Sequence, residues 1–107
     1  MEVTPNPKLE WPIAYEAVLE IARSERCRLK AYRCPAGKPT IGWGRTRGVK
    51  MGDTCTQAQA DVWFVEDLTE FTDGVRRVLK RDASENELGA LVSFAYNIGL
   101  AGFNGST

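Results

Sequence analysis

The sequence predicts an α+β protein whose elements follow the order helix, small antiparallel sheet, helix, helix. Apolar residues recur at three- and four-residue spacing between residues 11 and 25 and again after residue 56. The stretch between them, residues 28–56, is rich in glycine and proline and alternates between polar and apolar residues, as short paired strands do. Because the strands are confined to this one stretch, we expect the sheet to form a small lobe beside a helical core.

The first helix is expected to begin at Trp11, after a polar, proline-containing lead-in at residues 1–10. Pro12 suits the first turn of a helix, where its missing N–H costs no hydrogen bond. The apolar residues of this helix that share one face are Ala14, Ala17, Val18 and Ile21. Their spacing predicts a helix with one buried side.

Glu25 falls on the buried side of this helix. At about 100° per residue it lies within the apolar stripe, whereas Glu16 and Glu20 lie on the solvent side. Burial disfavours the charged form of a carboxyl and raises its pKa, which suits a general acid that works near neutral pH. The alternative is an ordinary helix-end glutamate that pairs with a nearby base such as Arg28. The residues by themselves leave both interpretations open.

The sheet region raises two further questions. The strand Thr40-Ile41-Gly42-Trp43-Gly44 contains two glycines, which either let a ligand or another backbone come close or only bend the sheet. The region also holds a cluster of basic residues, which is either a solvated hairpin face or a cationic rim for a polyanion such as a cell-wall polymer. The cluster consists of Lys30, Arg33, Lys38, Arg45, Arg47 and Lys50.

Two further helices follow the sheet. Thr56 is a plausible N-cap for a helix over residues 57–80, and Ser84 with Glu87 forms a capping box that opens a helix over residues 85–99, closed by Gly99. The apolar face expected for the helix at 57–80 consists of Ala60, Phe64, Leu68, Phe71, Val75 and Val78.

Composition argues against several function classes. The 14 basic and 14 acidic residues of the 107-residue chain cancel, and no long basic run occurs, so nucleic-acid binding is not expected. No apolar run approaches the roughly 20 residues of a membrane span, so stable membrane insertion is not expected. The chain has three cysteines, no histidine and no Cys-x-x-Cys pair, so a zinc site is not expected. Nothing else in the sequence indicates a cofactor. The N-terminus lacks a signal-peptide pattern, which predicts synthesis in the cytoplasm.

The ordered motifs resemble a known family. The string LKAYRCPAGKPTIGWG, preceded by Glu25, resembles the active-site segment of the phage-type lysozymes, the endolysins of tailed bacteriophages and prophages. GVKMGDTCTQAQA, the Asp67-Leu68 pair, ALVSFAYNIG and GFNGST resemble later segments of the same family. The resemblance covers most of residues 13–107. It implies a single lysozyme-like domain over residues 1–107, in which residues 28–56 form the lobe that carries the active-site hairpin.

The resemblance implies a muramidase that needs no cofactor and cleaves the β-1,4 bond between N-acetylmuramic acid and N-acetylglucosamine in peptidoglycan. The family's catalytic set falls on Glu25, Cys34 and Thr40. Glu25 would protonate the leaving oxygen, while Cys34 and Thr40 would place or activate a water on the other face of the sugar, giving inversion. The resemblance leaves the role of Cys34 open: it is a base, a stabiliser of the transition state or a polarisable side chain that fills space. The alternative is that Cys34 is a buried cysteine that acts only as a small apolar residue.

Three departures from the family pattern lead to further expectations. Arg26 stands where the family usually has glycine, and Arg45 where it usually has histidine. Family members also continue beyond GFNGST, so the C-terminal lobe is expected to be incomplete. The apolar residues of the last helix and of the segment that follows it would then be exposed, and they should promote self-association. They are Leu88, Leu91, Val92, Phe94, Ala95, Ile98 and Phe103.

The resemblance also implies where the protein acts and with what. An endolysin resides in the host cytoplasm before lysis and then reaches the periplasm and the cell wall, for which a holin must permeabilise the membrane. The alternatives are a non-catalytic peptidoglycan-binding module and an inactive prophage remnant.

Overall fold

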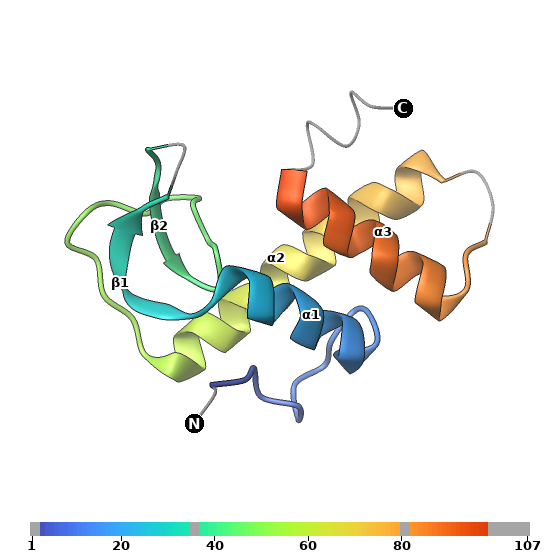
Figure 1. The fold of residues 1–107 in the computed structure, drawn as a ribbon, viewed down its shortest axis with the longest axis horizontal. Coiled ribbons are helices and arrows are strands. Elements are labelled where there is room, and N and C mark those ends of the chain that lie inside the picture. The colour runs from blue at the N-terminus through green and yellow to red at the C-terminus, as the bar shows by residue number, and fades with distance from the viewer. Residues whose placement is uncertain (1–2, 35–36, 80–81, 99–107) are drawn as a thin grey trace.

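The computed structural model describes residues 3–34, 37–79 and 82–98 and confirms the α+β class (Figure 1). Its elements occur in the predicted order. They are α1 (Tyr15–Glu25), β1 (Arg28–Arg33), β2 (Pro39–Gly42), α2 (Gln57–Val78) and α3 (Glu85–Ile98). The sheet lies at one end of the long helix α2, and α3 packs across the other end and against α1 (Figure 1).

Helix α1 begins four residues later than the expected start at Trp11. Pro12 disfavours a helical conformation at the residue before it, and the Trp11 indole N–H donates to the carbonyl of Asn6 at 2.9 Å. The N-cap is Ala14, whose extended backbone (φ −56°, ψ 139°) makes no side-chain cap. From Tyr15 onward the predicted stripe is confirmed, because Val18 and Ile21 are both buried.

The predicted caps of the two later helices are confirmed. The Thr56 hydroxyl accepts from the Gln59 backbone N–H at 3.1 Å, and the Gln59 side chain accepts from the Thr56 N–H at 2.9 Å. The Ser84 hydroxyl accepts from the Glu87 N–H at 3.2 Å, and the Glu87 carboxylate accepts from the Ser84 N–H at 3.3 Å. Each cap satisfies two N–H groups at a helix start, which fixes where the helix begins.

The core lies among the three helices and the turn after β2. It is centred on Phe64 of α2, whose ring stacks on Trp43 at 5.6 Å between centroids and meets Tyr96 edge-on at 5.7 Å. The predicted face of α2 is confirmed, with Phe71 and Val78 only partly buried. The buried apolar residues around Phe64 include Val18, Ile21, Ala60, Leu68, Val75, Leu88, Val92 and Ala95.

Asp61 joins three separate parts of the chain. Its buried carboxylate accepts from the Trp43 indole N–H at 2.7 Å, from the Gln57 amide at 3.0 Å and from the backbone N–H of Asn6 at 3.1 Å. A buried carboxylate is tolerated when its oxygens are hydrogen-bonded in this way. Asp61 therefore fixes the strand end, the lead-in and α2 relative to one another.

Strands β1 and β2 are antiparallel, with Tyr32 opposite Thr40. On its other edge β1 meets the segment before α2, through a bridge between Lys30 and Thr54. The expected antiparallel sheet in residues 28–56 is thus present, with β1 between two neighbouring segments.

The surface of α3 is less apolar than expected. Of the residues expected to drive association, Leu88, Val92 and Ala95 are buried, and Leu91 is partly buried against the core. Phe94 is 50% exposed. The side chain of Ile98, and all of Gly99 and Phe103, lie outside the described residues. None of the described helices combines the length and the apolar character that a bilayer crossing requires.

Candidate active site

Glu25 is the last residue of α1 and is half-buried, whereas Glu16 and Glu20 are exposed. This is the distribution that the helical periodicity predicted. Desolvation by burial raises the pKa of the Glu25 carboxyl above its usual value. The alternative role as a helix-end partner of a base is not supported, because within the described part of the chain no ion pair involves Glu25. A carboxyl that holds its proton more firmly can donate it nearer neutral pH.

Gly44 explains the second glycine of the Gly-Trp-Gly strand. Its φ is +105°, and a Cβ at this position would lie 2.7 Å from Glu25 Oε2 and 3.4 Å from the Tyr96 hydroxyl oxygen. Any other residue would collide with the carboxyl. The group that comes close to Gly44 is therefore the Glu25 side chain, rather than the ligand or second backbone that the sequence suggested, and the turn after β2 forms one wall around it.

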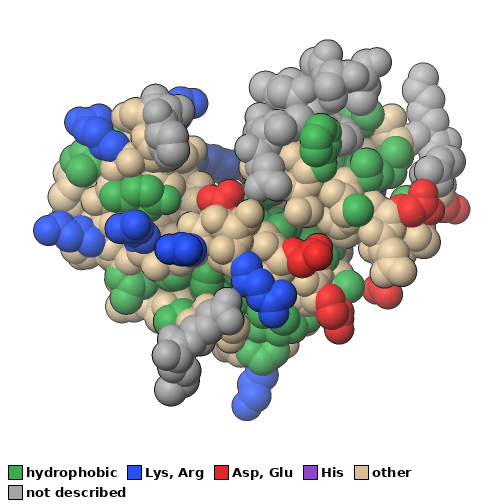
Figure 2. Space-filling view, in the orientation of Figure 1, with side chains coloured by type: hydrophobic (Ala, Val, Ile, Leu, Met, Phe, Trp, Pro, Cys, Tyr) green, Lys and Arg blue, Asp and Glu red, His purple; other side chains and the backbone are tan. Residues whose placement is uncertain are grey.

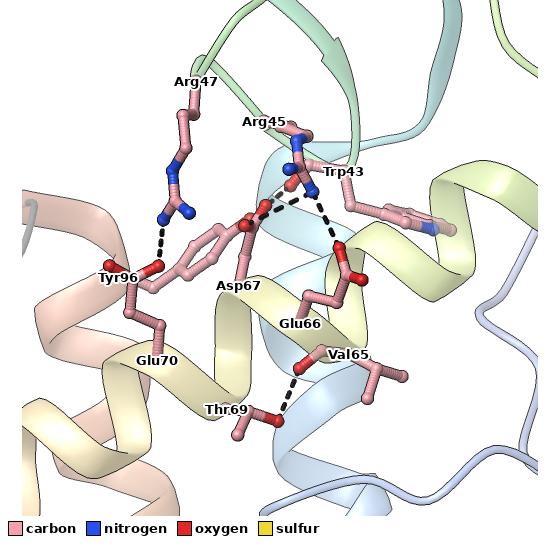
Figure 3. Close-up of polar contacts among 9 residues, drawn as sticks. All are labelled: Trp43, Arg45, Arg47, Val65, Glu66, Asp67, Thr69, Glu70 and Tyr96. Atoms are coloured by element: carbon pink, nitrogen blue, oxygen red, sulfur yellow. Dashed lines mark hydrogen bonds and ion pairs between the residues drawn. The ribbon is translucent and has the colours of Figure 1, made fainter.

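Glu25 opens into a cavity of about 330 Å³ between the sheet lobe and α2. The cavity is lined by Glu25, Gly44, Arg45, Thr46, Arg47, Asp67, Glu70, Phe71 and Tyr96. Arginines from the segment after β2 face carboxylates from α2 across it (Figure 3). Among the described residues, no group of His, Cys, Asp and Glu is arranged to hold a metal ion.

Arg45 is the most heavily engaged residue of this cavity. Its guanidinium lies 3.3 Å from Glu66 and 3.6 Å from Asp67, and it also stands over the Trp63 ring at 5.2 Å from the centroid (Figure 3). Arg47 pairs with Glu70 on the outer side of the same wall. These contacts join the sheet lobe to α2 at the position where the family usually has histidine.

Asp67 and Tyr96 complete the inner wall. Burial raises the pKa of the Asp67 carboxyl, while the nearby Arg45 guanidinium opposes this shift. Tyr96 donates from its hydroxyl to the carbonyl of Trp43 at 2.8 Å (Figure 3). Burial raises the pKa of the Tyr96 phenol well above its usual value, and the Asp67 and Glu25 carboxylates raise it further. Tyr96 thus stands as a neutral hydroxyl within the electrostatic reach of both carboxyls.

Cys34 and Thr40 lie on the hairpin and are not among the described residues that line this cavity. Thr40 is buried, and its hydroxyl donates to the carbonyl of Lys38 at 3.0 Å. Cys34 is half-buried directly after β1, and its N–H donates to the same Lys38 carbonyl at 3.0 Å.

Tyr32 connects this hairpin pair to Glu25. It is the cross-strand partner of Thr40. Burial raises the pKa of the Tyr32 phenol, and the charges of Glu25 and Cys34 raise it further. Glu25 precedes the end of β1 at which Arg28 pairs with Gly42, whereas Cys34 follows the other end, at which Arg33 pairs with Pro39. Tyr32 lies on the strand between them.

Sequence reasoning gave no role to Tyr32, Asp61 or Tyr96, and it noted Asp67 only as part of a motif. A single tyrosine or aspartate within a helix or a strand has no distinctive spacing, so the sequence alone does not show that it belongs to a functional site. Asp67 offered one signal, because it immediately precedes the buried Leu68 on α2.

The fold and the site define a class of protein: an α+β fold in which a buried carboxyl at the end of the first helix faces a small hairpin lobe across a cavity. This is the lysozyme-like arrangement. The phage lysozyme family model matches residues 22–107, and the chain belongs to the phage lysozyme family.

Relatives and solved structures agree with this assignment. The chain is 37% identical over 95 residues to an endolysin of Acyrthosiphon pisum secondary endosymbiont phage 1, and 34% identical over 100 residues to the endolysin of Salmonella phage P22. Both alignments cover 89% of this chain. The muramidase domain of SpmX from Asticaccaulis excentricus superposes with a TM-score of 0.77 at 30% identity, over 90% of this chain and 65% of that one.

The chain is shorter than the endolysins to which its sequence is similar. It spans 65% of the endosymbiont phage endolysin, 68% of the P22 endolysin and 33% of the endolysin of Bacillus phage PZA. In those relatives, further residues accompany the part that corresponds to this chain.

Proposed function

We propose that this chain is a glycoside hydrolase of the endolysin type, which cleaves the β-1,4 bond between N-acetylmuramic acid and N-acetylglucosamine in peptidoglycan. The observation that carries the proposal is the Glu25 carboxyl, half-buried, with a raised pKa, at the wall of a cavity of about 330 Å³. Membership of the phage lysozyme family supports it, as do relatives that are named endolysins and a structural neighbour that is named a muramidase domain.

In this proposal Glu25 is the general acid. Its proton passes to the glycosidic oxygen as the bond from that oxygen to the anomeric carbon breaks, so that the departing sugar leaves as a neutral alcohol. Gly44 accommodates the carboxyl, because the absence of a Cβ leaves room for it beside the turn after β2.

In the same proposal, Cys34 and Thr40 position and deprotonate the water that attacks the sugar. The Thr40 hydroxyl donates to the Lys38 carbonyl, so its oxygen lone pairs can accept a hydrogen bond from a water on the hairpin side. The water attacks the anomeric carbon from the face opposite Glu25 and gives up its proton on the hairpin side, where the Cys34 side chain is the proposed acceptor. The sugar product has inverted configuration.

The test compares turnover with binding. A suspension of chloroform-treated Gram-negative cell walls should clear when the chain is added, and a pull-down on insoluble peptidoglycan should retain the chain. Binding without clearing would instead identify a non-catalytic peptidoglycan-binding module, and neither binding nor clearing would identify an inactive remnant.

Location and partners belong to the same proposal. The chain would be made in the host cytoplasm and would reach the wall only after a holin has permeabilised the membrane. Self-association is proposed through the outer face of α3, where Phe94 is 50% exposed. Light scattering of the purified chain measures the oligomeric state directly.

A further inference from the structure

The charges of this neutral chain are segregated. Residues 26–56 contain eight Lys and Arg residues against the single acid Asp53, so this region carries a net charge of +7 and the remainder carries −7. Figure 2 shows most of the visible Lys and Arg side chains over the sheet end of the molecule and most Asp and Glu over the helical end. Two ends of opposite sign orient a protein in the field of a charged surface.

Part of the positive charge lies along β1. A shallow groove of about 530 Å³ is formed by residues 26–32 alone, and it includes Arg26, Arg28 and Lys30. All three side chains are exposed, as is Arg33 at the end of the strand. Arg28 stacks over the Tyr32 ring at 4.8 Å, and within the described part of the chain no ion pair involves any of the four. These four residues are the β1 basic surface.

The β1 basic surface also carries an exposed apolar residue. Leu29 lies in the same groove and is 43% exposed. A leucine between cations is the composition that binds at the interface of an anionic bilayer, because the cations meet the headgroups while the apolar group enters the acyl boundary. A soluble polyanion, by contrast, would bind the cations but would leave the Leu29 side chain exposed to water.

We infer that the β1 basic surface is a peripheral binding site for an anionic phospholipid bilayer. Arg26, Arg28, Lys30 and Arg33 contact lipid phosphates, and Leu29 enters the headgroup region. The site is separate from the cavity that holds Glu25, and none of these five residues lines that cavity. The inference therefore does not depend on the proposed hydrolase activity.

The test is co-sedimentation of the 107-residue chain with vesicles of phosphatidylcholine alone and with vesicles that also contain phosphatidylglycerol. Binding is expected only to the anionic vesicles. It should weaken between about 0.01 M and about 1 M salt, where the Debye length falls from roughly 30 Å to roughly 3 Å. Equal binding to both vesicles, or binding to neither, would overturn the inference.

Two charge variants locate the site. The triple variant Arg28→Gln, Lys30→Gln, Arg33→Gln should bind anionic vesicles roughly 100-fold more weakly, because each cation at the membrane surface contributes about fivefold. The matched control Lys8→Gln, Arg76→Gln, Arg77→Gln removes the same charge from exposed positions outside the sheet lobe and should change binding less than about threefold. Equal losses would mean that binding follows net charge, and the site would be refuted.

Leu29 distinguishes a bilayer from a soluble polyanion. Leu29→Ser should lower vesicle binding about tenfold, whereas Val62→Ser, at a residue 47% exposed on α2, should have no effect. Inorganic polyphosphate should compete weakly. Full competition by polyphosphate, together with unchanged vesicle binding by Leu29→Ser, would contradict the lipid assignment. Thermal melting verifies that each variant is folded. If the triple variant does not fold, the single variants Arg28→Gln, Lys30→Gln and Arg33→Gln take its place, and each should bind anionic vesicles about fivefold more weakly than the parent.

Discussion

The carboxyl of Glu25 occupies the space that a side chain on Gly44 would need, because a Cβ on Gly44 would stand 2.7 Å from Glu25 Oε2. The turn after β2 thus has its glycine at the place where the Glu25 carboxyl needs room. This contact joins the end of α1 to the end of the sheet and fixes the position of the carboxyl in the cavity.

Gly44→Ala should destabilise the protein and displace Glu25. The new methyl group meets the flexible end of the Glu25 side chain, which can turn away, so it adds an overpacking cost near the lower end of about 1–3 kcal/mol to the strain of a positive φ. Gly52→Ala is the matched control, since Gly52 has a similar φ of +99° and nothing within 4 Å of a Cβ. Urea denaturation of both variants measures the difference in the free energy of unfolding, and equal losses would show that the contact with Glu25 is not tight.

Arg26→Gly should stabilise the protein by about 0.5–2 kcal/mol. Arg26 caps α1 with φ +59° and ψ 146°, a conformation that glycine adopts easily and that costs a side-chain-bearing residue roughly 1–3 kcal/mol. Arg28→Gly, in the extended strand β1, should instead destabilise, because a glycine there loses more conformational entropy. A thermal melt in which Arg26→Gly is the less stable chain would contradict the assigned strain.

Arg45 and Asp67 should be energetically coupled. Their side chains are only 19% and 13% exposed, so a double-mutant cycle with Arg45→Met and Asp67→Asn should give about 1–2 kcal/mol, between the values for surface and buried pairs. The comparison pair Arg47 and Glu70 is far more exposed and should show a smaller coupling that salt removes. A larger coupling for the exposed pair would reverse this interpretation of the cavity wall.

Glu25→Gln should raise stability at pH 7 by roughly 0.5–2 kcal/mol, the usual range for a single stabilising substitution. Because burial raises the pKa of Glu25 in the folded state, the folded chain binds more protons than the unfolded chain above the usual value of 4.5. The stability of the parent therefore falls as pH rises from 4.5 through the raised pKa. The advantage of Glu25→Gln should accordingly vanish below pH 4.5, and a constant difference at all pH values would exclude burial as its cause.

Cys34→Ser should strongly impair wall clearing, while Cys34→Asp retains part of it, since aspartate can also act as a base on the hairpin. Cys27→Ser and Cys55→Ser should leave turnover nearly unchanged, because both residues pack against the hydrophobic core rather than standing on the hairpin. If Cys34→Ser clears walls as fast as the parent, Cys34 is structural and Thr40 alone positions the water.

The parts of this fold that depend on local chemistry could be predicted from the sequence. Thr56 and Ser84 cap helices through residues three positions away, and Glu25 lies on the buried side because helical periodicity extends to it. The start of α1 could not be predicted, because Trp11 is held by a contact to Asn6 rather than by its own helical preference.

The parts of the candidate site that depend on distant contacts could not be predicted. Tyr96 reaches the Trp43 carbonyl across 53 positions of sequence, and Asp61 reaches Asn6 across 55. No local pattern encodes such a pair. The family motifs located Glu25, Cys34 and Thr40, but the cavity wall formed by Arg45 and Asp67 became evident only once α2 was packed beside the hairpin.

The most direct test of the account is the lytic rate of Glu25→Gln beside Glu20→Gln, an exposed glutamate on the same helix. The amide has no proton to give, so Glu25→Gln should fold, bind insoluble peptidoglycan and clear it about 10²–10⁴-fold more slowly than the parent, the usual contribution of a general acid. Glu20→Gln should clear at the parent rate. Near-parental clearing by a folded Glu25→Gln chain would contradict the role of Glu25 as the general acid.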